Sequence, residues 1–288
     1  MKPAKQLLTY GALALAVIFW GLSFVATKVA LQSFTPFCLI FFRFFTAAIF
    51  FSLLFWRTGF PLLTRKTLQS LMLLAAMQPG MYFTFETIGL QYTSATKTSL
   101  ILTTIPVVVL LLSALILGER LRRINLIGIF LSLGGVALLI FGEKTHTTFD
   151  GALIGDLLIF GAVLSASLYM VMARRLGATI SSLHITGMQI IFGAVLFFPA
   201  FLWDRPKLDW QAISTDSLTA LVGLTVFATV CAFLCYNYAL TKVPAARASV
   251  SLNTIPLVTA FGAWLLLGES LTMLQFLGAA IVLFAVFL

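Results

Sequence analysis

The chain has 288 residues, of which 61% are hydrophobic and only 9% are charged, and its mean hydropathy is +1.08. A soluble domain is about 45 to 50% apolar and about a quarter charged, so this composition excludes most soluble enzyme folds and indicates a membrane protein. The formal net charge of +9 comes from basic residues scattered near helix ends, a distribution typical of cytoplasmic membrane loops and not of nucleic-acid binding.

Apolar runs separated by proline, glycine or charged clusters predict ten membrane-spanning helices. At roughly 20 residues per spanning helix, the chain has no room for a sizeable soluble domain. The first run follows Lys2 and Lys5 and is too long for a cleaved signal segment, so we expect it to be a retained span. In chain order, the predicted helices are 9–31, 35–56, 67–90, 94–117, 124–142, 152–173, 181–203, 217–240, 245–267 and 271–288.

The chain contains an internal repeat. Residues 92–128 align without a gap on residues 242–278, at a shift of 150, and thirteen of the 37 aligned positions are identical. Shared apolar composition alone gives roughly three or four identities, so duplication is the better explanation. The identities include two motifs present in both copies, Thr104-Ile105-Pro106 with Thr254-Ile255-Pro256 and Gly118-Glu119 with Gly268-Glu269. Earlier helices align weakly at a shift near 146, which pairs Lys28 with Arg174.

An odd number of helices in each repeat inserts the second copy upside down relative to the first. We therefore predict an all-α integral membrane protein of ten transmembrane helices, built as two inverted five-helix repeats, residues 9–142 and 152–288. With the N-terminus inside, twelve basic residues fall on the cytoplasmic side and four or five on the other. We expect a multi-pass protein of the cytoplasmic (inner) membrane with both termini in the cytoplasm.

Inverted repeats can exchange conformations, which opens a midplane site first to one side and then to the other. No Walker-type phosphate loop supports direct ATP drive, and no filter-like loop supports a channel. The sequence therefore predicts a secondary transporter that works by alternating access and is not an enzyme. The competing interpretations are an intramembrane lipid-modifying enzyme and a lipid flippase.

Short motifs in the first four predicted helices, with the repeated Ile-Pro and Gly-Glu pairs, are typical of a known family. These motifs are Phe19-Trp20-Gly21, Ser23-Phe24-Val25, Arg43-Phe44, Gly89-Leu90 and the segment from Ala95 to Ser99. They resemble the drug/metabolite transporter superfamily, specifically the ten-helix EamA-type permeases, over essentially the whole chain. The resemblance implies a central cavity walled by helices 1, 3, 4, 6, 8 and 9. It also implies export of amino acids, related small metabolites or drugs. Smaller four-helix relatives use a glutamate in their first helix, and the first predicted helix here has none, so their proton mechanism is not carried over by position. Proton coupling here is instead a hypothesis that rests on Glu86.

Glu86 is an acidic side chain in the middle of a predicted span, with Tyr82 one turn earlier on the same face. Burying an unpaired carboxylate in hydrocarbon is costly, so Glu86 should face an aqueous cavity, pair with a base or stay protonated. Two interpretations stay open. Glu86 is either a proton acceptor or ligand for a substrate amine, or a structural partner of Arg43 or Lys97.

Other polar and aromatic residues are candidates for substrate binding or coupling. The second repeat offers different chemistry at the place equivalent to the buried acid, where Tyr236 and Asn237 stand. Lys97 and Arg247 are repeat-equivalent and lie near helix ends, where each either snorkels to the interface or binds a substrate carboxylate. Trp20 either stacks on a planar or cationic ligand or packs against lipid and neighbouring helices.

Pro106 and Pro256 each remove a helix hydrogen bond, so the two helices that contain them are predicted to break there and to hinge. Thr103 and Asn253 lie on the faces that lead to these breaks, where each either lines the cavity or bonds a neighbouring helix. The pattern of three cysteines and two histidines predicts no metal site, no catalytic residue and no cofactor. The expected partners are a small-molecule substrate and membrane lipid, without nucleic acid, and the oligomeric state is left open between a monomer and a homodimer.

Three further acids lie near predicted helix ends. Glu119 and Glu269 each follow a glycine and are expected to cap the N-terminus of the helix that comes next in the chain. Asp156 lies near the start of its own helix and suits the same role.

Overall fold

The computed structural model describes residues 3–61, 63–117, 127, 131, 134–135, 138, 151–243, 248–249, 251–269 and 272–287. Every regular element within these ranges is helical. By length and composition, six of the described helices can cross a membrane. The prediction of an all-helical, multi-pass membrane protein is therefore confirmed. Most of the helix predicted at 124–142 lies outside the described residues.

The elements before residue 118 cover the first four predicted spans. In chain order they are α1 (Pro3–Ala30), α2 (Pro36–Thr58), α3 (Arg65–Ala75), η1 (Ala76–Met81), α4 (Tyr82–Gly89), α5 (Ala95–Leu102) and α6 (Ile105–Leu117). The elements after residue 150 cover the later spans. They are α8 (Gly151–Leu176), α9 (Ser182–Asp204), η2 (Arg205–Lys207), η3 (Trp210–Ala212), α10 (Thr215–Gly223), η4 (Leu224–Cys231), α11 (Ala232–Lys242), η5 (Leu252–Thr254), α13 (Ile255–Leu267) and α14 (Met273–Phe287).

Local sequence explains where several helices begin and end. Ser94, Ser181 and Ser214 are the N-caps of α5, α9 and α10, and each side chain accepts a hydrogen bond from a backbone N–H three residues on. Pro36 begins α2, where a missing N–H costs nothing. Gly268 ends α13 with a φ of 67°, a left-handed conformation that favours glycine.

The helix predicted at 67–90 is broken. Gln78 has a φ of −144° and a ψ of 114°, which are extended values, and the π-helical turn η1 around it joins α3 to α4. Pro79 follows directly and lacks the N–H that a continuous helix needs. The prediction of one unbroken helix is therefore wrong at this point.

The other interruptions lie before the two repeated prolines and in the span 217–240. The chain turns at Thr103–Thr104 before Pro106, and the 3-10 turn η5 precedes Pro256, so the breaks expected there are present. Hinge motion at these prolines stays a prediction. Between α10 and α11 the chain forms a second π-helical segment, η4, which the sequence did not predict.

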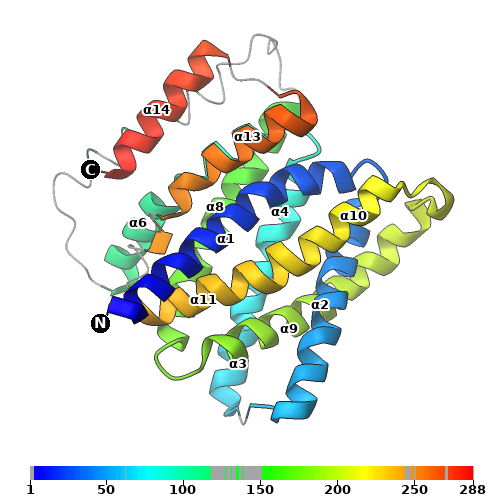
Figure 1. Ribbon diagram of the computed structural model, residues 1–288, viewed down its shortest axis with the longest axis vertical. Coiled ribbons are helices and arrows are strands. Elements are labelled where there is room, and N and C mark those ends of the chain that lie inside the picture. The colour runs from blue at the N-terminus through cyan, green and yellow to red at the C-terminus, as the bar shows by residue number, and fades with distance from the viewer. Residues whose placement is uncertain are drawn as a thin grey trace.

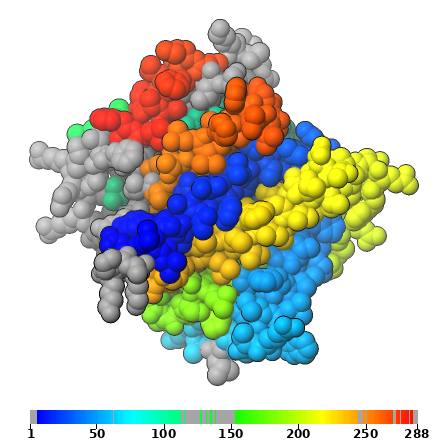
Figure 2. All heavy atoms as spheres, viewed as in Figure 1, coloured from blue at the N-terminus to red at the C-terminus, as the bar shows by residue number. Residues whose placement is uncertain are grey.

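Figure 1 shows α1 lying between α13 on one side and the α10–α11 span on the other. The space-filling view shows these helices packed into one face without a visible opening between them (Figure 2). Apart from this group, α2 packs along α9 over a large contact. Gly187 of α9 allows this close approach, because a Cβ there would collide with Phe55 of α2. Gly193 of α9 likewise allows η1 to approach, because a Cβ there would collide with Pro79.

Candidate functional site

A small cavity lies in the middle of the helices. Its volume of about 50 Å³ has room for about three or four water molecules. The walls come from helices that are far apart in sequence. The lining residues are Trp20, Ser23, Phe24, Arg43, Gln78, Tyr82, Phe83, Glu86, Ser99, Leu102, Ile105, Ala166, Tyr169, Met170, Tyr236, Leu252 and Ile255. All six helices that the resemblance implies contribute to the wall, and Arg43 reaches it from α2 in addition.

Glu86 of α4 lines this cavity and is only 2% exposed. One of its carboxylate oxygens, Oε2, accepts a hydrogen bond of 2.9 Å from the Thr87 hydroxyl. Lys97 is not its ion-pair partner, because the Lys97 ammonium lies 2.8 Å from Asp156. Glu86 is therefore a buried carboxylate at the wall of a cavity large enough for water.

Arg43 of α2 is the second charged group of the cavity and is 3% exposed. Its Nε donates a hydrogen bond to the Thr229 hydroxyl, and its guanidinium carbon lies 4.5 Å from the centroid of the Phe83 ring. Within the part of the chain that the structure describes, no ion pair within 4.0 Å joins Arg43 to Glu86. One cavity thus holds a guanidinium and a carboxylate that do not neutralise each other by direct contact.

The π-helical segment η4 helps to position the cavity wall. A π turn widens the helix and leaves backbone groups free to bond elsewhere, and such turns often occur at functional sites. The Ala228 carbonyl accepts a 3.1 Å hydrogen bond from the Trp20 indole, while Thr229 bonds Arg43. The Trp20 ring lies 5.0 Å from the Tyr236 ring, centroid to centroid, so its orientation in the wall is fixed from two sides.

Tyr236 and Asn237 point in different directions from α11. Tyr236 is fully buried and lines the cavity. Asn237 lies outside the lining. Its amide nitrogen donates a 2.8 Å hydrogen bond to the Thr186 hydroxyl, and its amide oxygen accepts a 2.7 Å hydrogen bond from the Tyr169 hydroxyl. Asn237 therefore connects α8, α9 and α11 and holds Tyr169, which does line the cavity.

Thr103 and Asn253 lie beside lining residues without lining the cavity themselves. The Thr103 hydroxyl donates 2.6 Å to the carbonyl of Leu100 in its own helix. Asn253 is 3% exposed, and neither atom of its amide has a hydrogen-bond partner in the described parts of the chain. Roles for both residues in substrate binding stay predictions.

Of the two repeat-equivalent bases Lys97 and Arg247, the structure describes only Lys97. Lys97 is 1% exposed and ion-paired with Asp156, so the interpretation that it snorkels to the interface is wrong. Asp156 bonds across to another helix, which also corrects its expected role as a cap of its own helix. Arg247 lies outside the described residues. Glu269 does cap a helix N-terminus, as expected of this acid, but the helix is α5 and not the one that comes next in the chain. Glu119 lies outside the described residues.

The sequence did not single out Ser23, Arg43 or Tyr169 as ligands, although all three line the cavity. A signal existed for Arg43, because a base inside an apolar span is costly and marks a functional position in membrane proteins. Tyr169 and Ser23 had no such signal, since tyrosine and serine are common on packed membrane helices.

An all-helical, multi-pass membrane protein with a charged cavity between its helices has the architecture of a membrane transporter, and comparison with known proteins shows that class. Residues 7–141 and 153–288 each match the EamA-like transporter family, so the chain belongs to this family and the resemblance found in its motifs is confirmed.

The relatives extend this result over the whole chain. A Bacillus subtilis protein named uncharacterized transporter YetK is 29% identical and covers 98% of this chain and 87% of its own length. An uncharacterized transporter of Archaeoglobus fulgidus is 28% identical over 96% of each chain. A protein of known crystal structure superposes with a TM-score of 0.68 at 17% identity, over 96% of this chain and 94% of its own, which speaks for the fold alone.

Proposed function

We propose that this transporter is a secondary exporter of amino acids and related small metabolites or drugs, and that it works by alternating access. The observation that supports the substrate class is the presence of Arg43 and Glu86, without an ion pair between them, in the wall of one cavity. A guanidinium binds a carboxylate through parallel hydrogen bonds, and a carboxylate binds an ammonium group. A zwitterionic substrate satisfies both charges at once, and the rings of Trp20, Phe83 and Tyr236 offer an apolar surface for its side chain.

The proposal includes ten transmembrane helices in two inverted five-helix repeats. At the shift of 150 found in the sequence, residues 76–81 of η1 fall on 226–231, inside η4. The interruption before Pro106 and the one before Pro256 are related by the same shift. The distribution of basic residues supports an inner-membrane protein with both termini in the cytoplasm. Labelling of single cysteines at Lys66 and Trp210 from the two sides of the membrane tests this orientation.

Proton coupling through Glu86 completes the proposed mechanism. One carboxylate holds either a proton or a substrate ammonium group, so the two compete for the same site. A proton that enters from outside displaces the substrate there, and a substrate that binds from the cytoplasm displaces the proton. Each tenfold proton gradient then supplies about 1.4 kcal/mol for export. The direction of transport rests on the family resemblance.

Transport into liposomes that contain the purified protein tests this function. A panel of labelled amino acids, nucleosides, sugars and lipophilic cations is offered with and without an imposed pH gradient. We expect saturable movement of amino acids that the gradient accelerates, and we expect Glu86→Gln to abolish the acceleration. Asp216→Asn is the matched control, because this acid is exposed in the first turn of α10, away from the cavity. Gradient-driven movement that persists in Glu86→Gln would exclude the coupling role.

The experiment also separates the competing interpretations. A folded protein that moves no member of the panel would favour a lipid substrate, as expected for a flippase. An intramembrane enzyme needs a nucleophile activated by a base or an acid–base pair at one point. Of the serines in the cavity wall, Ser23 and Ser99 each donate to a backbone carbonyl of their own helix and not to a base, which disfavours that alternative.

A further inference from the structure

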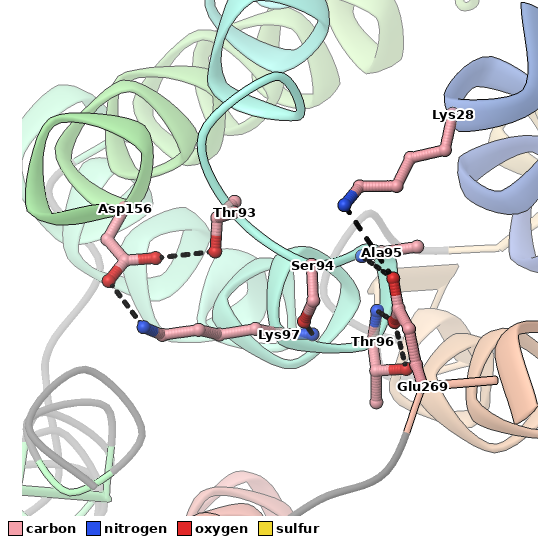
Figure 3. Close-up of polar contacts among 8 residues, drawn as sticks. All are labelled: Lys28, Thr93, Ser94, Ala95, Thr96, Lys97, Asp156 and Glu269. Carbon is pink, nitrogen blue, oxygen red and sulfur yellow. Dashed lines mark hydrogen bonds and ion pairs between the residues drawn. The ribbon is translucent and has the colours of Figure 1, made fainter. Parts of the chain in front are cut away.

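Glu269, just after α13, holds the N-terminus of α5 (Figure 3). Its Oε1 accepts a 3.0 Å hydrogen bond from the backbone N–H of Ala95. Its Oε2 accepts two hydrogen bonds from Thr96, one of 3.0 Å from the backbone N–H and one of 2.8 Å from the hydroxyl. Three bonds therefore connect two segments that are more than 170 residues apart.

The chemistry of a helix N-terminus explains this arrangement. The first N–H groups of a helix have no partner inside it, and the helix dipole places partial positive charge there, so a carboxylate is favoured. Ser94 satisfies one more of these groups, since its hydroxyl accepts from the N–H of Lys97. Lys28, in the last turn of α1, lies 3.7 Å from Oε1 of Glu269. One carboxylate thus joins α1, α5 and the end of α13.

A second ion pair holds the other flank of the same helix turn (Figure 3). Lys97 and Asp156 are 2.8 Å apart and each is 1% exposed, and Asp156 also accepts 2.9 Å from the Thr93 hydroxyl. This pair connects α5 to α8. Close to it, α4 and α8 cross tightly, because a Cβ on Gly155 would lie 3.0 Å from the carbonyl oxygen of Gly89.

These contacts lie between the cavity and the surface. Ser99, one turn deeper in α5 than Thr96, lines the cavity. On the other side, a surface hollow of about 280 Å³ is lined by Lys28, Leu31, Gln32, Leu90 and Gln91. Lys28 belongs to both the hollow and the contacts around Glu269, and α5 belongs to both these contacts and the cavity. Lys28 thus links the contacts around Glu269 to the hollow, and α5 links them to the cavity.

We propose that Lys28, Thr96, Lys97, Asp156 and Glu269, here called the outer cluster, form the gate that closes the cavity toward the α1–α2 connection. This inference rests on the proposed alternating-access function. Opening requires Glu269 to leave the N-terminus of α5, and each separated charge then regains water.

Hydration makes such a gate reversible. Burying a charge removes its solvation and direct pairing returns much of that loss, so closed and open states differ little in free energy. The Glu269 side of the cluster is partly open, since the side chains of Glu269 and Lys28 are 15% and 28% exposed. A seal made of leucine and phenylalanine would instead expose apolar surface to water at every opening.

A cysteine in the cavity measures whether the gate is open. Ser99→Cys serves as the reporter, in a background where the native cysteines are replaced by serine. These cysteines are Cys38, Cys231 and Cys235. A membrane-impermeant thiol reagent is applied to each side of sealed vesicles that contain the full chain, and the labelling rate is measured.

We expect Glu269→Gln to raise the labelling rate from the side of the α1–α2 connection about tenfold, as loss of a charge-assisted bond predicts. The matched control is Asp204→Asn. Asp204 also caps a remote helix N-terminus, 3.0 Å from the N–H of Phe37, and pairs with Lys207 at 3.3 Å. It does not belong to the outer cluster, so its loss should lower the melting temperature without changing the labelling.

The outcomes distinguish the gate from the function on which it rests. Labelling of the wild-type reporter from both sides supports alternating access, and labelling from one side only would overturn it and the gate together. With the reporter accessible from both sides, an unchanged labelling rate in Glu269→Gln would make the outer cluster a static clamp and overturn the gate alone. If Glu269→Gln does not fold, Lys28→Gln takes its place. We expect it to raise the labelling rate from the same side by a smaller factor.

Discussion

Arg43 uses only part of its hydrogen-bonding capacity. A guanidinium has five N–H donors, and within the described chain the structure shows one of them bonded to a protein side chain, Thr229. A buried cation with spare donors is costly unless water or a ligand satisfies them. The Phe83 ring stabilises the charge from one face, 4.5 Å away, and leaves the edge of the guanidinium available to the cavity. At the scale of single residues, Arg43 is therefore the strongest candidate to bind a substrate carboxylate.

Arg43→Lys keeps the positive charge but removes the Nε donor and the planar fork. We expect the KM for an amino acid to rise about tenfold, because a lysine cannot form the bidentate bond to a carboxylate. The matched comparison is the corresponding amine, which lacks the carboxylate and should show little change in KM. Concentration dependence of uptake into liposomes gives both values, and an equal rise for the two substrates would remove Arg43 from carboxylate binding.

Sequence reasoning found Glu86, Tyr82, Trp20 and Tyr236 because costly or amphipathic side chains stand out in apolar runs. It did not find the pairing of Lys97 with Asp156, since nothing local connects residues on two different helices. The snorkelling interpretation of Lys97 considered the helix end alone and ignored which helix packs against it.

At the scale of elements, the breaks in the spans decide where polar groups meet the cavity. Proline signalled two of them, since the turn at Thr103–Thr104 and the 3-10 turn η5 each precede a proline. The π-helical η4 had no signal, because residues 224–231 contain neither proline nor glycine. The Ala228 carbonyl and the Thr229 hydroxyl of this segment accept tertiary bonds from Trp20 and Arg43, and these bonds exist only after the helices have packed.

The packing of α9 against the broken span α3–α4 is tight enough to test by adding one carbon. Gly193→Ala places a methyl group into Pro79, next to the break at Gln78, and we expect it to lower stability by about 1 to 3 kcal/mol. Gly223→Ala is the matched control, because an added Cβ there has no neighbour within 4 Å and should leave stability unchanged or slightly higher. Thermal unfolding of both variants in detergent checks this, and equal melting temperatures would contradict the tight contact.

At the scale of the whole molecule, α8 forms polar contacts near both of its ends, through an acidic side chain near its start and a basic side chain in its last turn. Asp156 near its start pairs with Lys97 in the outer cluster. Arg174 in its last turn donates hydrogen bonds to the carbonyls of Leu240 and Val243, at the C-terminal end of α11. A base at a helix C-terminus and an acid at a helix N-terminus are both favoured by the helix dipole. The weak alignment that pairs Lys28 of the outer cluster with Arg174 relates these two places in the way that the proposed inverted repeat predicts.

An alternating-access transporter needs a closing contact on each side, and Arg174 stands where the second one belongs. Arg174→Gln removes the charge from the bonds to α11 and should favour the state that is open toward the cytoplasm. We therefore expect the Ser99→Cys reporter to be labelled faster from the cytoplasmic side and more slowly from the other, the reverse of the change in Glu269→Gln. Arg174 lies in the last turn of α8, whereas the outer cluster contacts α8 only near its start, at Asp156. Within the described residues, Arg174 and Glu269 bond to different partners, so the two free energies should add. The double variant should then return the ratio of the two labelling rates toward the wild-type value, because each change shifts the same equilibrium in the opposite direction. A double variant that is labelled faster from both sides would show two independent leaks instead of two gates on one equilibrium.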